Sequence, residues 1–217
     1  MMPAMHPVFE RLGASRLVAV VMIDREEHAV PLAQALLAGG VSAMELTLRS
    51  EAALGSLRRV VEGVPGMLVG AGTVIAESQI EGVMAAGAAF GVAPGTNPRI
   101  LAACRDAGLP FAPGIATPSD IESALEFDCR LLKFFPAGAM GGLDYLQGIA
   151  APYRHLGIRY LPLGGVDEEN LQRYVSAPDI LAVGGSWLAP RPLLESEDWS
   201  GVESLARRAA DLVAQEG

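Results

Sequence analysis

The sequence has almost no lysine and little charge of either sign. Lys133 is the only lysine among the sixteen Lys and Arg residues of the 217-residue chain, and charged residues make up just 19% of it. The formal net charge is −9, and no basic stripe with interleaved aromatic residues occurs. Nucleic acids and anionic membrane surfaces attract proteins through clustered cations. The composition therefore argues against both classes of partner.

Metal ligands are equally scarce. Cys104 and Cys129 have neither the spacing of metal ligands nor that of a redox pair, and Cys104 lies in a helical pattern that suits a small core residue. The histidines His6, His28 and His155 are scattered along the chain. A transition-metal site needs several such ligands close together. The sequence therefore predicts no protein-bound metal.

Long apolar runs are missing as well. No uninterrupted apolar stretch has the length of a membrane span, and residues 1–15 lack the basic segment and apolar run of a secretory signal. Hydrophobic residues nevertheless make up 51% of the chain, which suffices for a sizeable core. We therefore expect a soluble, cytoplasmic protein.

What the sequence does contain is a regular alternation of short apolar segments and amphipathic segments. The apolar segments predict strands at Leu17–Ile23, Ala43–Leu48, Met67–Gly72, Phe90–Ala93, Pro110–Gly114, Leu131–Phe135, Arg159–Leu163 and Ile180–Gly184. The amphipathic segments predict helices at Glu27–Ala38, Glu51–Glu62, Ser78–Ala86, Pro98–Ala107, Ser119–Phe127, Leu143–Ala150, Glu168–Val175 and Val202–Glu216.

Strands that alternate with helices predict an α/β fold with a parallel sheet. Eight such units in a chain of this length favour a (β/α)8 TIM barrel, with residues 1–217 forming a single domain. Met1–Arg16 would add a short helix or arm over the bottom of the barrel. A doubly wound open sheet is the alternative, but no GxGxxG motif follows the first predicted strand.

The single lysine lies in an apolar strand, Leu131–Phe135, that ends at Pro136. Burial penalises the ammonium form, so we expect a lowered pKa and a larger neutral fraction at Lys133. A neutral amine attacks carbonyl carbons, which makes Lys133 a candidate Schiff-base nucleophile. The alternative is a structural lysine whose stem is buried and whose head reaches water or a carboxylate.

The second predicted strand carries charged side chains on one face. Glu45, Thr47 and Arg49 alternate with apolar residues, so the three side chains should point into the barrel. Glu45 is then a candidate general acid/base, and Arg49 a candidate clamp for an anionic group of the substrate. A buried ion pair between Glu45 and Arg49 that merely stabilises the barrel is the alternative.

Glycine pairs follow the last two predicted strands. Gly164-Gly165 comes after strand seven, and Gly184-Gly185 precedes Ser186 after strand eight. Barrels commonly bind phosphate at this place through backbone N–H groups. The turn Gly70-Ala71-Gly72-Thr73 and the pair Pro94-Gly95 follow earlier strands, where they could line the same site or simply form turns.

Taken in order, these segments resemble a known family. The pattern comprises Glu45-x3-Arg49, Gly70 to Val74, Pro94-Gly95, Pro113 to Thr117, Lys133-Phe134-Phe135-Pro136, Gly164-Gly165 and Gly184-Gly185-Ser186-Trp187. It is similar to the bacterial 2-keto-3-deoxy-6-phosphogluconate (KDPG) aldolases, many of which also act on 2-keto-4-hydroxyglutarate (KHG). The resemblance runs from about Leu17 to the C-terminus. It implies a class I aldolase on a (β/α)8 barrel, commonly a homotrimer.

The resemblance also implies roles for single residues. Lys133 would form the Schiff base with the C2 ketone and Glu45 would relay protons. Arg49 and Thr73 would hold the carboxylate end beside Pro94. Gly164, Gly165, Gly185 and Ser186 would receive the phosphate. The products would be pyruvate and glyceraldehyde 3-phosphate from KDPG, or pyruvate and glyoxylate from KHG. Because an iminium is itself an electron sink, no metal or other cofactor is expected.

One residue departs from the family pattern. The family usually has Thr before the glycine pair after strand seven, whereas this chain has Leu163. The lost hydroxyl predicts altered selectivity at C4 or C5, so that the galactonate-derived epimer would be accepted comparably.

Two other classes of function stay open: a phosphate-binding barrel with different chemistry (an isomerase, an epimerase or a thiamine-phosphate-type synthase), and a binding protein without turnover. Phe134, Trp187 and Trp199 are candidates for an oligomer surface.

Overall fold

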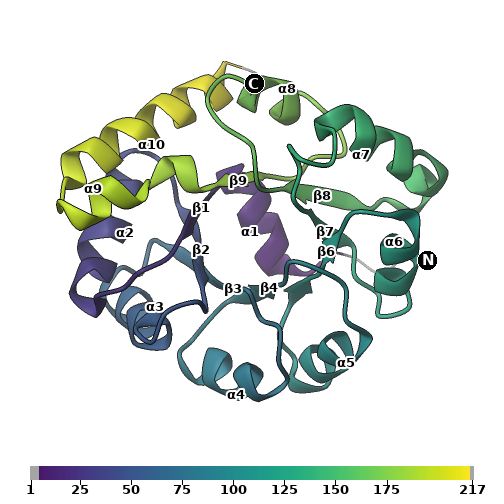
Figure 1. Cartoon of the computed structure of the whole chain (residues 1–217), viewed down its shortest axis with the longest axis horizontal. Helices are drawn as coiled ribbons and strands as arrows, with labels where there is room; N and C mark the ends of the chain where they lie inside the picture. Colours follow the sequence, from purple (N-terminus) through teal and green to yellow (C-terminus); the bar gives the residue numbers. More distant parts are fainter. Residues whose placement is uncertain (1–4, 216–217) are drawn as a thin grey trace.

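The computed structural model describes residues 5–215 and shows an α/β protein (Figure 1). The described chain contains nine strands: β1 Leu17–Val21, β2 Ala43–Thr47, β3 Leu68–Gly72, β4 Phe90–Val92, β5 Phe111–Ala112, β6 Gly114–Ile115, β7 Leu131–Phe134, β8 Arg159–Pro162 and β9 Val183–Gly185. The α-helices are α1 Pro7–Ser15, α2 Ala29–Ala38, α3 Ala53–Gly63, α4 Ser78–Ala85, α5 Pro98–Ala107, α6 Pro118–Leu125, α7 Gly142–Ala150, α8 Leu171–Val175, α9 Arg191–Glu195 and α10 Trp199–Ala214.

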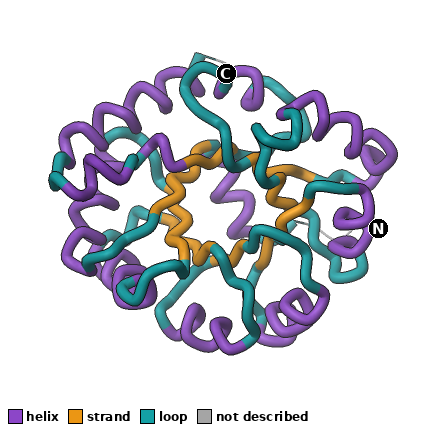
Figure 2. The backbone as a smooth tube through the Cα atoms, viewed as in Figure 1, coloured by secondary structure: helices purple, strands orange, loops and turns teal. Residues whose placement is uncertain are grey.

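All strand pairs are parallel, as the alternation of strands and helices predicts. Six strands form one sheet in the order β5-β4-β3-β2-β1-β9, and β6-β7-β8 form a second. Pro113 separates β5 from β6, so one predicted strand supplies an edge to each sheet. Isolated parallel bridges join Tyr160 to Ile180 and Leu163 to Gly184. In Figure 2 the strands lie in a ring, with helix α1 across its middle in this view and the other helices outside it.

The helix boundaries follow from local capping chemistry. Helix α5 spans the predicted residues, because the Asn97 side chain accepts the Arg99 N–H and Gly108 adopts a left-handed conformation at the other end. Helix α6 begins at Pro118 with a capping box between Thr117 and Asp120. These signals set where both helices begin and where α5 ends.

The apolar residues form two layers, one on each side of the strands. An outer cluster between strands and helices contains Met44 and Leu46. An inner cluster contains Ala43 and the first residues of other strands, and helix α1 packs onto it (Figure 1). Phe9 of α1 meets Phe90 edge-to-face at 6.4 Å between ring centroids. The predicted N-terminal helix therefore exists and covers the N-terminal ends of the strands.

Several predicted elements differ from those observed. Helix α8 begins at Leu171 rather than Glu168, because Asp167 Oδ1 accepts the Glu169 and Asn170 backbone N–H groups in a turn. The helix α9 and the one-turn helix Ser186–Leu188 were not predicted.

The suggestion that Phe134 lies on an oligomer surface is wrong, since this side chain is fully buried. Over residues 5–215, no helix is both long and apolar enough for a membrane span.

Candidate active site

One cavity of about 810 Å³ opens at the C-terminal ends of the strands, and every predicted site residue lines it. The residues come from separate turns of the chain: Glu45 and Arg49 from β2 and its loop, Thr73 after β3, Pro94 after β4, Lys133 from β7, Gly164 and Gly165 after β8, and Gly185 and Ser186 at β9. Parallel strands place all these ends on one side of the molecule, so residues far apart in sequence meet there.

A buried ion pair lies at the bottom of the cavity. The Lys133 Nζ is 3.0 Å from Oε1 and 3.2 Å from Oε2 of Glu45, and the two residues are only 5% and 1% exposed. The prediction that Glu45 points inward from β2 is confirmed. The alternative that Glu45 pairs with Arg49 is wrong, because the carboxylate is bound to Lys133 across the ring. The phenyl ring of Phe135 adds a cation–π contact, with Nζ 5.3 Å from its centroid.

A glycine on the neighbouring strand makes room for the Glu45 carboxylate. Gly72 pairs with Thr47 in the β2–β3 register. A Cβ atom at position 72 would lie 2.1 Å from Glu45 Oε1 and 2.6 Å from Glu45 Cγ. Glycine is therefore required here by the side chain of Glu45 and not by the backbone conformation.

Arg49 and Thr73 line the cavity at the outer ends of β2 and β3. The Arg49 Nε donates to Thr47 Oγ1 at 3.3 Å, and the Thr47 hydroxyl donates to the Val21 carbonyl oxygen at 3.0 Å. The buried Thr47 thus positions the guanidinium. Thr73 has φ 60°, a left-handed conformation that is unfavourable for a β-branched residue and that occurs preferentially at functional sites.

The opposite end of the cavity is built from glycines. Gly164 and Gly165 have φ values of 82° and 86°, which side-chain-bearing residues adopt only with strain. The Trp187 ring occupies the place of a side chain on Gly185, since a Cβ there would lie 1.8 Å from Cζ3 of the indole. Ser186 is exposed beside them. The four residues predicted to receive a phosphate therefore line one cavity, and their role in phosphate binding stays a prediction.

Three cationic side chains line the cavity, those of Arg49, Lys133 and Arg191. Lys133 is paired with Glu45, and Arg191 is paired with Asp24 and Glu195. Arg49 has no carboxylate partner within residues 5–215, so its charge is available to a small anionic ligand. No group of three or more His, Cys, Asp and Glu side chains that could hold a metal ion occurs within residues 5–215.

The sequence did not identify several lining residues. Phe135 forms part of the apolar wall, and the segment from Trp187 to Arg191 forms the rim beside the glycines. Leu163, which the sequence singles out as the departure from the family pattern, lines the cavity as expected. Phe135 and Trp187 stand within the recognised motifs, so their motif position could have identified them. Arg191 has no such signal, because it lies in a short helix that no periodic pattern predicts.

The chain is similar over nearly its whole length to proteins of one family. A sequence model of the family described as "KDPG and KHG aldolase" matches residues 8–205. The 2-dehydro-3-deoxy-phosphogluconate aldolase of Treponema pallidum is 41% identical over 209 residues, which cover 96% of this chain and 99% of the relative. The same-named protein of Dickeya dadantii is 44% identical over 198 residues, covering 91% and 92%. A solved structure of KDPG aldolase from Legionella pneumophila, with pyruvate captured as a covalent carbinolamine intermediate, has a TM-score of 0.87 at 36% identity and covers 93% of this chain and 96% of that one.

Proposed function

The chain belongs to the KDPG and KHG aldolase family, and from this membership and the geometry of the site we propose that it is a class I aldolase. The proposed reaction cleaves KDPG to pyruvate and glyceraldehyde 3-phosphate, and also KHG to pyruvate and glyoxylate. The observation that carries the proposal is the contact of 3.0 Å between the Lys133 ammonium and the Glu45 carboxylate inside the cavity at the C-terminal ends of the strands.

In the first half of the reaction, the amine of Lys133 becomes a nucleophile. The Glu45 carboxylate lies within hydrogen-bond distance, so it can accept a proton from the ammonium and leave a neutral amine. Nζ then attacks the C2 ketone carbon, and Glu45 returns the proton to the carbinolamine hydroxyl, which leaves as water to give an iminium and restores the carboxylate. Arg49, positioned by Thr47, holds the adjacent carboxylate together with Thr73.

In the second half, Glu45 acts as base and then as acid. It removes the proton of the C4 hydroxyl as the C3–C4 bond breaks, and the bonding electrons move through C3 to the iminium nitrogen. The aldehyde leaves and an enamine of pyruvate remains on Lys133. Glu45 returns the proton to C3, and water hydrolyses the resulting iminium to release pyruvate.

The decisive experiment traps the Schiff base. The protein is incubated with pyruvate and sodium borohydride, and the adduct is located by intact mass and peptide mapping. A reduced pyruvyl adduct on Lys133 supports the proposal, and the Lys133→Met variant is the control. The test is clean because the sequence contains no other lysine, which leaves the N-terminal amine as the only other candidate. Folded protein that forms no adduct would favour a different phosphate-barrel enzyme, such as an isomerase, an epimerase or a thiamine-phosphate-type synthase.

Metal independence is a further part of the proposal. The iminium supplies the electron sink that a divalent cation provides in metal-dependent aldolases, so the chemistry at Lys133 has no need of a Lewis acid. Cleavage should therefore persist after dialysis against EDTA. Loss of activity that a divalent cation restores would contradict this.

We also propose that the two sheets form one (β/α)8 barrel domain and that the protein is a homotrimer. The bridges at Tyr160–Ile180 and Leu163–Gly184 support closure of the ring.

The proposal of a trimer rests on family membership. Leu54, Ile75 and Met84 are the large hydrophobic residues that are exposed within residues 5–215, and they are the candidates for the subunit interface. Light scattering coupled to size-exclusion chromatography gives the mass directly. A cytoplasmic location stays a prediction.

A further inference from the structure

The glycine-rich end of the cavity has a cationic neighbour in Arg191. This residue begins α9, five positions after Ser186, and lines the same cavity as Gly164, Gly165 and Gly185. Of the three cations that line the cavity, Lys133 is paired with Glu45, and Arg49 is bound to Thr47 at the β2 side. Arg191 is the cation of the lining that follows Gly185 and Ser186 in the chain.

Two carboxylates from different elements hold the Arg191 guanidinium. Its Nη2 donates to Asp24 Oδ2 at 3.0 Å, and its Nε donates to Glu195 Oε1 at 2.6 Å. Within residues 5–215 no hydrogen-bond partner is present for Nη1. The side chain is 61% exposed, so it lies at the rim where a ligand enters from solvent. A guanidinium that is fixed at two nitrogens keeps a donor group for a third partner.

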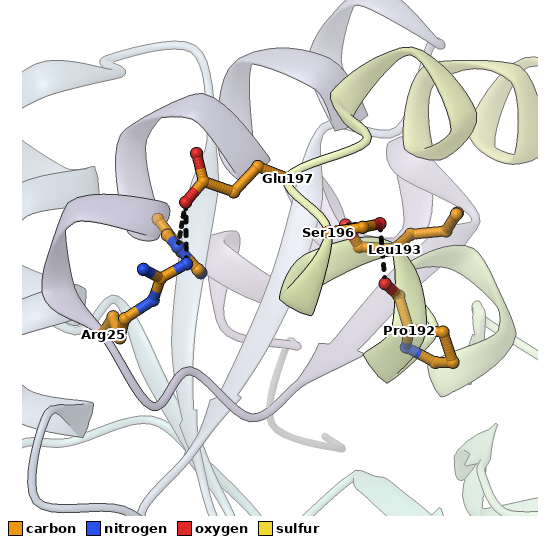
Figure 3. Close-up of polar contacts among 6 residues, drawn as sticks. Arg25, Pro192, Leu193, Ser196 and Glu197 are labelled. Atoms are coloured by element: carbon orange, nitrogen blue, oxygen red, sulfur yellow. Dashed lines mark hydrogen bonds and ion pairs between the residues drawn. The ribbon is translucent and has the colours of Figure 1, made fainter.

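Helix α9, which carries Arg191, is fixed beyond its other end as well. Glu197 accepts a hydrogen bond from Arg25 Nη2 at 2.7 Å and lies 3.2 Å from His28 Nε2, as Figure 3 shows for Arg25. The Ser196 hydroxyl donates to the Pro192 carbonyl oxygen at 2.8 Å in the same view. Contacts to residues 24–28 after β1 thus hold α9 at both ends, which limits how far Arg191 can move from the cavity.

We propose that Arg191 is a specificity-determining residue that binds the distal phosphate of the substrate through its Nη1 side. The proposal rests on the proposed aldolase function and assigns its phosphate preference to a charge. Backbone N–H groups and the Ser186 hydroxyl supply hydrogen bonds to a phosphate but no full positive charge. A phosphate carries about −1.5 to −2 at neutral pH, and a charge-assisted contact with a guanidinium is stronger than one with a neutral donor.

The test compares two substrates that react by the same chemistry and differ at the distal end. KDPG carries the phosphate, whereas KHG has a shorter chain that ends in a carboxylate. In Arg191→Ala, kcat/KM for KDPG should fall about tenfold relative to kcat/KM for KHG. The loss should appear in KM rather than in kcat, because the phosphate is remote from the bond that breaks. The inhibition constant of inorganic phosphate should rise by a similar factor.

A matched control is available on α10. Arg207 is also exposed and forms the same kind of i,i+4 pair, with Glu203 at 2.6 Å, but it does not line the cavity. Arg207→Ala should leave the KDPG-to-KHG ratio unchanged. Arg191→Gln removes the charge while keeping a polar side chain with a shorter stem, and serves if the alanine variant does not fold.

Four outcomes would overturn the proposal. An unchanged ratio in both Arg191 variants would show that the guanidinium does not contact the phosphate. An equal loss with both substrates would show that Arg191 merely holds α9 in place. Wild-type protein that forms the pyruvate adduct on Lys133 but does not prefer KDPG would leave the aldolase intact and refute the role of Arg191. Wild-type protein that forms no adduct would refute the proposed function itself, and the role of Arg191 with it.

Discussion

Lys133 and Glu45 stand 88 residues apart in the sequence, yet Nζ lies 3.0 Å from the carboxylate in a region that is almost closed to solvent. Each charge is the main compensation for burying the other. The pair therefore couples stability to catalysis, because the groups that react are also the groups that neutralise each other. A substitution at either position changes both properties, and the two effects must be measured separately.

The first prediction concerns the stability of this pair. Lys133→Met should lower the free energy of unfolding by about 3 kcal/mol, because it leaves a buried carboxylate without its counter-charge. The double variant Lys133→Met/Glu45→Met should recover most of that loss, since two apolar side chains need no compensation. Urea unfolding followed by circular dichroism measures both. A double variant that is less stable than Lys133→Met would show that the carboxylate is not destabilised by losing Lys133.

The second prediction separates the roles of the two groups. Glu45→Gln keeps the size of the side chain but cannot carry protons, so kcat for KDPG cleavage should fall about 10²–10⁴-fold. Exchange of the pyruvate methyl protons with solvent deuterium, followed by NMR, should fall in parallel. Borohydride should still trap pyruvate on Lys133 after long incubation. Proton exchange at the wild-type rate in Glu45→Gln would assign the base to another residue.

The third prediction uses the contact between Gly72 and the catalytic carboxylate. In Gly72→Ala the new methyl group meets Glu45 Oε1 at 2.1 Å, so the carboxylate must move. Because displacements of about 1 Å at reacting groups can cost about 10²-fold in rate, kcat/KM should fall by that order. Gly148→Ala is the control, since a Cβ there has nothing within 4 Å. Equal activity of the two variants would mean that the carboxylate is not positioned by the space at residue 72.

The fourth prediction concerns Leu163, which lines the cavity where the family usually has Thr. Without a hydroxyl to distinguish the epimers, kcat/KM for the gluconate- and galactonate-derived phosphates should agree within about tenfold. Leu163→Thr should shift the ratio toward the gluconate form. Leu163→Val has the shape of threonine without its hydroxyl, so it separates hydrogen bonding from volume. A large gluconate preference in the wild type would contradict the prediction.

The fifth prediction concerns the two free thiols. Burial raises the pKa of Cys104 to about 12, and burial together with the neighbouring Asp128 raises the pKa of Cys129 to about 11. The reactive thiolate is therefore scarce at pH 8 and becomes abundant only as the pH approaches 11. Native protein should react slowly with a disulfide reagent at pH 8, and both cysteines should react in urea. Rapid stoichiometric labelling of the native protein would contradict these pKa values.

The sequence by itself determined the parallel α/β organisation and the identity of many of the residues around the cavity. Continuous apolar segments specify strands that are covered on both faces, and capping residues such as Asn97 and Thr117 specify where helices begin. Since parallel strands bring their C-terminal ends together, residues at those ends could be assigned to one site without coordinates. The alternation along β2 also determined that Glu45 points inward.

The tertiary structure alone decided which of these residues contact each other. The partner of Glu45 is Lys133 and not Arg49. The sequence could not show this, because the distance between side chains on different strands depends on strand register and on closure of the ring, which no local pattern encodes. It likewise decided the need for glycine at position 72, which arises from a side chain of another strand. Only the tertiary structure identified Arg191 as a cavity residue, since its short helix has no periodic signal. The helix is held in place by Asp24, which is distant in the sequence, and by Glu197, which belongs to no recognisable motif. Sequence patterns are local, whereas a site is set by long-range packing.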